Sequence, residues 1–396
     1  MGVKNLNTTK YLIIIFLITT TGCLAQTETT VMKTGAERFD VYLPMLKDKK
    51  AGLVINNTSI VGQEHLVDFL LQQKIEIVRI FAPEHGYRGE AAAGEEVRDG
   101  KDLKTGIPVV SLYGETRKPA PEQLTELDVI IFDIQDVGCR FYTYISTLHL
   151  VIEACAENNI TLIVLDRPNP NGDYVAGPVL KSEFQSFVGM DQIPVVHGCT
   201  VGELAKMINE EGWTKARNKC DLIVIPVSNY THLTPYQLPV KPSPNLPNYL
   251  SVRLYPSLCF FEATSISVGR GTEFPFQVLG GLNSDFGDFQ FIPYDMPGIA
   301  MNPLHEGKTC FGIDLRNLTE IPTFTLKFFL HFYQQFEKKE DFVTNQNWFN
   351  LLAGTDEVLK QIKNGKTEYE IVQSWQPELT KYKDIRKKYL LYPDFE

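Results

Sequence analysis

The chain alternates short apolar segments with segments of helical spacing through its first 230 residues, and this alternation constrains the fold most. The strand-like apolar segments are 51–59, 75–80, 108–114, 128–136, 160–170 and 220–229. The helix-like segments are 65–73, 144–159 and 200–212, with a further helix start within 119–127. Apolar strands separated by helices predict an α/β fold, in which a parallel sheet carries helices on both faces.

The rest of the chain has a different composition. A proline-rich stretch at 231–256 predicts either a linker or an extended segment that wraps the first domain. The remainder mixes strand-like stretches with a helix predicted at 324–339. Its last segments are charged and rich in aromatic residues, which predicts a packed C-terminal region rather than a tail.

The N-terminus predicts export. Lys4 and Lys10 come before an apolar run that is too short for a membrane span, and Cys23-Leu24-Ala25 follows, so residues 1–25 are typical of a signal peptide. Two processing routes stay open. Cleavage after Ala25 would give a soluble periplasmic protein, whereas cleavage before Cys23 would give a lipidated, membrane-anchored cysteine. The Gly22-Cys23 pair resembles a lipobox and favours the second route, although Thr20 stands where an aliphatic residue is usual.

Composition and missing motifs exclude several classes of function. With 396 residues, 43% of them hydrophobic, the chain can form two domains, and its net charge of −10 argues against a nucleic-acid partner. It has no GxGxxG after the first strand, no GxxxxGK[ST] and no GxSxG, so we predict no nucleotide cofactor and no hydrolase nucleophile elbow. The cysteines after Cys23 form no CxxC pair and the histidines are scattered, so we predict no metal site.

Polar side chains follow several predicted strands. In a parallel sheet the carboxyl ends of the strands meet at one edge, where ligands bind. Strand ends also carry polar residues for capping and solvation, so no single one is decisive, but their convergence favours a functional edge. The candidates at this edge are Asn56, Glu84, His85, Tyr113, Asp133, Asp136, Asp166, Arg167 and Asn169.

Two further segments carry candidate residues. In the first, Arg140 could clamp a carboxylate or form a structural ion pair, and Tyr142 could stack on a sugar or line the core. In the second, Glu262 lies in an apolar, aromatic setting, and glycines flank Arg270 shortly before Glu273. The alternative for the second segment is a hairpin turn with an exposed arginine.

Two carboxyl groups in one cleft, with one of them in an apolar setting, are what glycoside hydrolysis requires. One protonates the leaving oxygen, and the other acts as base or nucleophile. Glu84 and Glu262 are the predicted pair. Their separation decides between inversion and retention, and the sequence leaves that choice open.

Five motifs together resemble one bacterial family. They are PEHGYRGEAAAGE, DIQDVGCRFYTYISTL, DRPNPNG with GPVL, VVHGCTVGELA and SVGRGTEFPF, and the resemblance runs from about residue 35 to 396. The family was first catalogued as DUF1343, and its characterised members are exo-β-N-acetylmuramidases of the NamZ type. The resemblance implies a Rossmann-like domain at 35–230, a smaller α+β domain at 231–396, and an active-site cleft between them. It also implies release of N-acetylmuramic acid from the non-reducing end of peptidoglycan fragments.

The resemblance also suggests roles for individual residues. Glu84 would be the principal acid or base, held by His85, with Glu262 as its partner, and Glu90 would bind substrate although aspartate is more usual at that place. Asp133, Asp136 and Arg140 would orient the sugar, and Arg140 or Arg270 would bind the lactyl carboxylate of muramic acid. Two alternatives remain: a non-catalytic sugar-binding lipoprotein on the same fold, and an exported esterase or deacetylase.

Overall fold

The computed structural model describes residues 1–2, 31–84, 86–87, 99–114 and 116–396 of the chain. Its largest feature is a seven-stranded sheet with the strand order β11-β8-β7-β1-β4-β6-β5. Six of the strands are parallel, and only β5 runs antiparallel to its neighbour β6. The strands are β1 Lys50–Ile55, β4 Glu76–Ala82, β5 Gly100–Lys101, β6 Pro108–Ser111, β7 Val129–Asp133, β8 Thr161–Leu165 and β11 Leu222–Ile225. The predicted α/β fold with a parallel sheet is confirmed.

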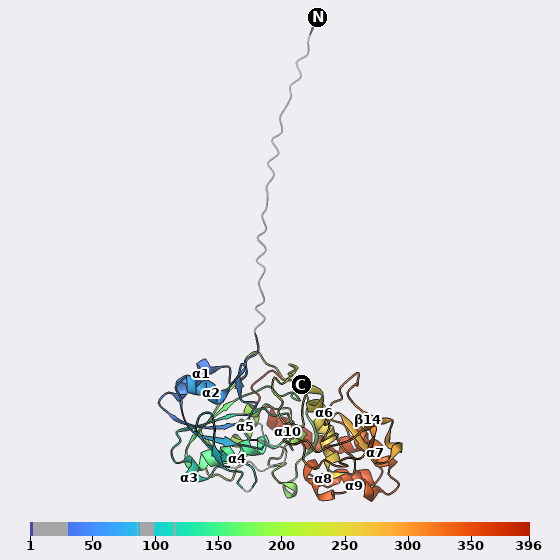
Figure 1. Ribbon diagram of the computed structural model, residues 1–396. Helices are drawn as coiled ribbons and strands as arrows, with labels where there is room; N and C mark the ends of the chain where they lie inside the picture. Colours follow the sequence, from blue (N-terminus) through green and yellow to red (C-terminus); the bar gives the residue numbers. More distant parts are fainter. Residues whose placement is uncertain (3–30, 85, 88–98, 115) are drawn as a thin grey trace. The chain divides into compact units, whose positions relative to one another are not determined.

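Both faces of the sheet are buried, which explains why its strands are continuous apolar runs. Successive side chains of a strand point to opposite faces. In β7, Val129 and Ile131 belong to one apolar core, whereas Ile130 and Phe132 belong to the other. Helices α1 and α2 cover the first face, and α3, α4 and α5 cover the second (Figure 1).

The helices around the sheet are α1 Phe39–Leu46, α2 Leu66–Gln72, α3 Pro121–Leu124, α4 Tyr144–Asn158 and α5 Val201–Glu210. The four that the sequence predicts are confirmed, with ends shifted by a few residues, and α1 is an addition. Helix α5 begins where expected, because the Thr200 side chain accepts a hydrogen bond from the Glu203 amide and the Glu203 carboxylate accepts one from the Thr200 amide.

The order of the strands gives the sheet a switch point. From β1 the chain moves outward to β4 and then β6, returns to β7 on the other side of β1, and moves outward again to β8 and β11. This is the Rossmann order. Ligands of such sheets bind beyond the carboxyl ends of the strands, near the place where the order reverses.

The C-terminal part is smaller and mixed. A three-stranded antiparallel sheet is surrounded by short helices. Its elements are α6 Tyr249–Leu258, η2 Cys259–Ala263, β12 Val278–Gly281, η3 Ser284–Phe286, β13 Phe289–Phe291, β14 Cys310–Asp314, α7 Lys327–Gln335, η4 Lys339–Asp341, α8 Gln346–Ala353, α9 Glu357–Lys363 and α10 Glu368–Arg386. Helix α7 is shorter at both ends than the predicted 324–339.

Smaller elements connect these parts. They are the hairpin β2 Ile60–Val61 with β3 Glu64–His65, the antiparallel pair β9 Ala176–Val179 with β10 Pro194–Val196, and η1 Ser182–Phe184. The first part of the proline-rich stretch, 231–248, is extended and lies against the first domain. The carbonyl of Pro242 accepts a hydrogen bond from Tyr142 at 2.7 Å, and that of Lys241 accepts one from Asn57 at 2.9 Å. The rest of the predicted stretch, from Tyr249, is helical and belongs to α6.

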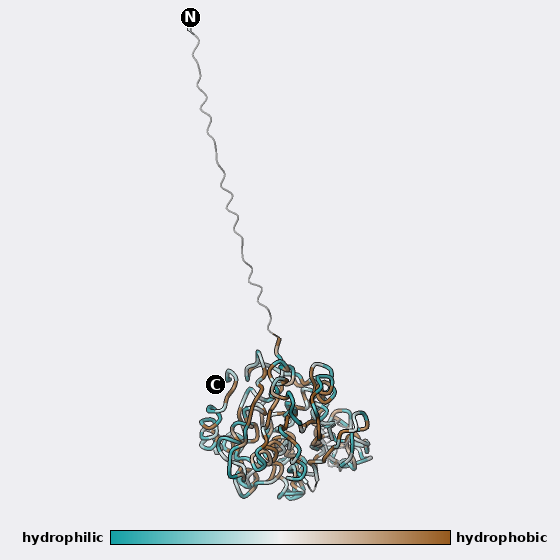
Figure 2. Tube along the Cα trace, turned by 90° about the vertical axis from the view of Figure 1, so that its left-hand side faces the viewer, coloured by the Kyte–Doolittle hydropathy of each residue, from teal (hydrophilic) through white to brown (hydrophobic). Residues whose placement is uncertain are grey.

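Met32–Glu396 forms one compact unit. One apolar core extends from α4 and α5 into α6, α7, α8 and α10, and Figure 2 shows apolar stretches in the interior with polar segments on the outer turns. A domain boundary near residue 230 therefore stays a prediction. None of the helices in the described residues combines the length and apolar character that crossing a bilayer requires.

Candidate active site

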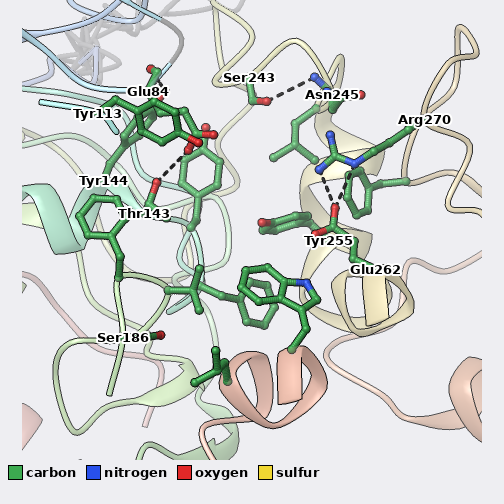
Figure 3. Close-up of a pocket in the computed structure, with 18 of the residues that line it drawn as sticks. Glu84, Tyr113, Thr143, Tyr144, Ser186, Ser243, Asn245, Tyr255, Glu262 and Arg270 are labelled. Carbon is green, nitrogen blue, oxygen red and sulfur yellow. Dashed lines mark hydrogen bonds and ion pairs between the residues drawn. The ribbon is translucent and has the colours of Figure 1, made fainter. Parts of the chain in front are cut away.

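A cavity of about 450 Å³ lies where the carboxyl edge of the large sheet meets the C-terminal part. Its volume is typical of a site for a small ligand. Glu84 and Tyr113 come from loops that follow β4 and β6, and Glu262 and Arg270 come from the C-terminal part (Figure 3). The two predicted catalytic carboxylates therefore line the same cavity.

Glu84 is held by hydroxyl groups. It follows β4 in a turn in which the Gly86 amide donates to the Pro83 carbonyl at 3.0 Å, with Gly86 at a φ of +73°. The Thr143 hydroxyl donates to Glu84 Oε2 at 3.1 Å, and the Tyr144 hydroxyl donates to the Glu84 carbonyl at 3.4 Å (Figure 3). Both donors stand at the start of α4, so the helix holds the backbone of Glu84 through Tyr144 and its carboxylate through Thr143.

Tyr113 is the third hydroxyl beside Glu84. Burial, together with the charge of Glu84 and a hydrogen bond to it, raises the pKa of Tyr113 to about 12. The phenol therefore keeps its proton at neutral pH and can donate to Glu84. A hydroxyl group can both donate and accept. Among the described residues, the hydroxyl groups around Glu84 can consequently act as hydrogen-bond donors or as acceptors.

Glu262 forms an ion pair on the other wall of the cavity. Its Oε1 accepts hydrogen bonds from Arg270 Nε at 3.0 Å and Nη2 at 2.5 Å (Figure 3). Burial alone would lower the pKa of Arg270, but the Glu262 carboxylate outweighs it and the pKa is raised. The expected apolar setting is therefore only part of the surroundings of Glu262, because a guanidinium faces its charge.

The glycines beside Arg270 have the constrained backbone that the sequence predicts. Gly269 and Gly271 have φ values of +79° and +80°, which L side chains rarely adopt. A Cβ on Gly271 would lie 2.5 Å from the carbonyl oxygen of Tyr294. The loop therefore needs both glycines to hold Arg270 against Glu262.

Aromatic side chains form much of the remaining wall. Tyr142 contacts Tyr144 and Tyr255 edge to face, with ring centroids 4.9 and 6.0 Å apart. Its hydroxyl is bonded to a backbone carbonyl, so Tyr142 offers an aromatic ring rather than a free hydroxyl. Trp348, from α8, lines the cavity from the C-terminal side. Such rings can stack on the faces of a sugar.

Arg140 lies outside the cavity, which corrects the prediction that it binds substrate. Its side chain is fully buried, and its guanidinium donates to the carbonyls of Pro178, Ile193 and Leu352 at 2.8–2.9 Å. Burial lowers the pKa of Arg140 to about 10. The side chain ties parts of the backbone together, and its complete burial closes it to a ligand.

Asp133 and Arg167 form a buried ion pair with each other. Arg167 donates from Nε at 2.6 Å and from Nη2 at 2.8 Å to the two carboxylate oxygens of Asp133. Both side chains are at most 2% exposed. The strand ends therefore carry charged residues, as predicted. This ion pair links the end of β7 to the segment that follows β8, and neither residue lines the cavity.

Four other predicted substrate-binding residues are also engaged inside the protein. Asp136 accepts from the Gly138 amide at 2.6 Å and lies 3.4 Å from His197. Asn169 donates to the Cys199 carbonyl, and Asn56 accepts from the Thr58 amide and hydroxyl. Asp166 accepts from the hydroxyls of Thr200 and Tyr392 and from the Gly202 amide. All four are nearly or fully buried and lie outside the cavity lining.

The remaining predicted residues fall into two groups. Glu273 is exposed and lines a separate groove beside Phe274 and Phe291, so it does not join the carboxylates of the cavity. His85 and Glu90 lie outside the described residues. Among the residues that the structure does describe, no cluster of three or more histidine, cysteine or acidic side chains could hold a metal ion.

Several residues of the cavity carry no clear signal in the sequence. Arg117, Ser243, Asn245 and Trp348 line it from loops or a helix that the motifs do not mark. Thr143 could have been found, since it precedes the predicted helix 144–159 and lies in the same motif as Tyr142. The loop residues could not, because their approach depends on how the C-terminal part packs against the sheet.

Comparison with known proteins shows that most of the chain is similar to one family. Two profiles, described as the N- and C-terminal parts of exo-beta-N-acetylmuramidase NamZ, match residues 51–250 and 253–392. The peptidoglycan beta-N-acetylmuramidase NamZ of Bacillus subtilis (strain 168) is 38% identical over 375 residues, which cover 89% of each chain.

Two crystal structures of DUF1343 family proteins from Bacteroides fragilis NCTC 9343 have the same fold. They match with TM-scores of 0.85 and 0.76 at 43% and 29% sequence identity. The matches cover 92% and 91% of this chain, and 100% and 99% of theirs. The chain therefore belongs to the exo-beta-N-acetylmuramidase NamZ family.

Proposed function

We propose that this protein is an exo-acting glycoside hydrolase that releases N-acetylmuramic acid from the non-reducing end of peptidoglycan fragments. The observation that carries the proposal is the position of Glu84 and Glu262 on the lining of one cavity of about 450 Å³. Membership of the NamZ family supports both the reaction and the substrate class.

The surroundings of the two carboxyl groups favour different roles. Glu262 faces the Arg270 guanidinium, which stabilises a negative charge, so it suits the base or nucleophile. Glu84 lies among hydroxyl groups that can accept or donate, so it suits the acid. Glu84 would protonate the glycosidic oxygen as the bond from C1 to that oxygen breaks. Glu262 would either take a proton from the water that attacks C1, or attack C1 itself and form a glycosyl ester that water then hydrolyses with Glu84 as the base.

Hydrolysis of a chromogenic muramic acid glycoside tests the proposal. The wild type should release para-nitrophenol from para-nitrophenyl β-N-acetylmuramic acid. Glu262→Gln should lower kcat on this substrate by at least about 100-fold, because it removes the group that donates an electron pair to water or to C1. Glu84→Gln should lower kcat by at least about 100-fold on a muramyl disaccharide, whose sugar leaving group needs the proton that Glu84 supplies. Glu306→Gln, an exposed change outside the cavity, is the matched control and should keep full activity.

Products from a defined peptidoglycan saccharide test the exo mode. Mass spectrometry should find free N-acetylmuramic acid as the only new monosaccharide at early times, whereas internal cleavage would release longer fragments. A folded wild type that binds muramyl saccharides without hydrolysing any would instead indicate a sugar-binding protein.

We also propose that the protein is exported and attached to a membrane through a lipidated Cys23. The motif in its first 25 residues supports this. Growth with an alkyne-tagged fatty acid should label the wild type but not Cys23→Ala, and the labelled protein should sediment with membranes. An unlabelled mature protein beginning at Gln26 would contradict lipidation and leave export intact.

A further inference from the structure

Muramic acid differs from glucosamine by a lactyl ether that ends in a carboxylate. An enzyme that selects muramic acid therefore needs a cation at the place where this carboxylate lies. Arginine suits that task, since its guanidinium binds a carboxylate through two parallel hydrogen bonds. The question is which arginine of this chain has donors available.

Two of the candidate arginines are already engaged. Arg140 is fully buried and donates to three backbone carbonyls. Arg270 lines the cavity, but two of its nitrogens donate to Glu262. Using Arg270 for the substrate would weaken the pair that holds a proposed catalytic carboxylate.

Among the residues that the structure describes, Arg117 is the other guanidinium in the lining of the cavity. It stands in the loop after β6, and its side chain is exposed. Within the described part of the chain, Glu and Asp side chains form no ion pair with it. Its guanidinium carbon lies 4.3 Å from the centroid of the Phe187 ring, and Phe187 lines the same cavity. A guanidinium stacked on a ring keeps its N–H donors in its own plane, where they remain available to a ligand.

The position of Arg117 is also electrostatically suitable. Its charge acts on Tyr113, which is hydrogen-bonded to Glu84, so the guanidinium lies on the Glu84 side of the cavity. A substrate carboxylate that entered there would be attracted by the guanidinium.

We propose that Arg117, stacked on Phe187, binds the lactyl carboxylate and makes the cavity specific for muramic acid. This inference rests on the proposed function, because it assigns a specificity residue for that reaction. The proposed contact requires a charged carboxylate on the substrate and two parallel N–H donors on Arg117.

The test compares two substrates in two proteins. The substrates are para-nitrophenyl β-N-acetylmuramic acid and its lactyl methyl ester, which has the same shape without the charge. Arg117→Met should lower kcat/KM for the acid by about 10- to 100-fold, the range of a charge-assisted hydrogen bond, and affect the ester much less. Arg117→Lys should recover part of the loss, since lysine keeps the charge but not the fork.

Arg316→Met is the matched control. Arg316 also stacks on an aromatic ring, with its guanidinium carbon 4.3 Å from the centroid of Phe274, but it lies outside the cavity. It should leave the ratio of acid to ester unchanged. An Arg117→Met protein that keeps the wild-type ratio of kcat/KM, or that loses activity on the acid and the ester equally, would overturn this inference and leave the proposed function standing. A wild type inactive on both substrates would instead count against the proposed function.

Discussion

Arg140 holds its guanidinium in the core with three backbone carbonyls as acceptors. We predict that Arg140→Lys lowers the free energy of unfolding by about 3 kcal/mol, because an ammonium cannot reach all three and leaves buried carbonyls unpaired. Urea unfolding measures the change. Arg316→Lys, at an exposed ion pair, should cost less than about 1 kcal/mol. A stable Arg140→Lys protein with altered preference for muramic acid would restore Arg140 as a ligand.

At the scale of residues, the sequence indicates which charged residues are candidates for the site, but it does not show what each of them contacts. It identified Glu84 and Glu262, which line the cavity, because each stands in an unusual local motif. It could not tell Arg140 and Arg270 apart, and it did not mark Arg117, since all three stand in loop-like segments. Whether an arginine faces carbonyls, a carboxylate or open space depends on segments far away in the chain, such as Leu352 for Arg140.

At the scale of elements, the loop 269–271 sets the geometry of the pair between Glu262 and Arg270. We predict that Gly271→Ala lowers kcat/KM by about 10- to 100-fold, because its Cβ would meet the Tyr294 carbonyl at 2.5 Å and displace Arg270. Gly365→Ala is the control. Its φ of +72° is similar, but nothing lies within 4 Å of the added Cβ, so only stability should fall, by about 1 kcal/mol. Equal activity in both variants would mean that the loop does not position Arg270.

The elements of the parallel sheet were predictable because burial on both faces produces continuous apolar strands, and helices between them have a different period. β7 and α4 match their predicted segments within a few residues. The sequence did not predict most helices of the C-terminal part. In α10, which includes Pro377, the hydrophobic face is weak because its buried side chains contact several different parts of the protein. Local pattern alone does not show such contacts.

At the scale of the whole molecule, a buried network joins segments that are far apart in sequence. Asp166, at the end of β8, accepts hydrogen bonds from Thr200 before α5 at 2.7 Å and from Tyr392 near the C-terminus at 2.5 Å. Arg386, at the end of α10, donates to the Gly198 carbonyl and to Asp394. Helix α10 thereby reaches back from the C-terminal part to the sheet region (Figure 1). Both of these parts of the molecule contribute walls of the cavity.

The network should make stability depend on pH. Burial first, and then the nearby charge of Glu203, raise the pKa of Asp166 to about 6, against hydrogen bonds from Tyr392, Gly202 and Thr200. In the unfolded chain this pKa is about 3.9. Between these values the folded state binds more protons than the unfolded state, so the contribution of Asp166 is fully present below about pH 4 and is lost as the pH rises through 6.

We therefore predict that the difference in unfolding free energy between wild type and Asp166→Asn shifts by about 3 kcal/mol from pH 4 to pH 7, with the wild type relatively more stable at the lower pH. Urea unfolding at several pH values measures it. Asp314→Asn is the control, because its ion pair with Arg316 lowers the pKa of Asp314 and its linkage has the opposite sign. A difference for Asp166→Asn that grows with pH would mean that its hydrogen bonds outweigh burial and that the network is held by an ionised carboxylate.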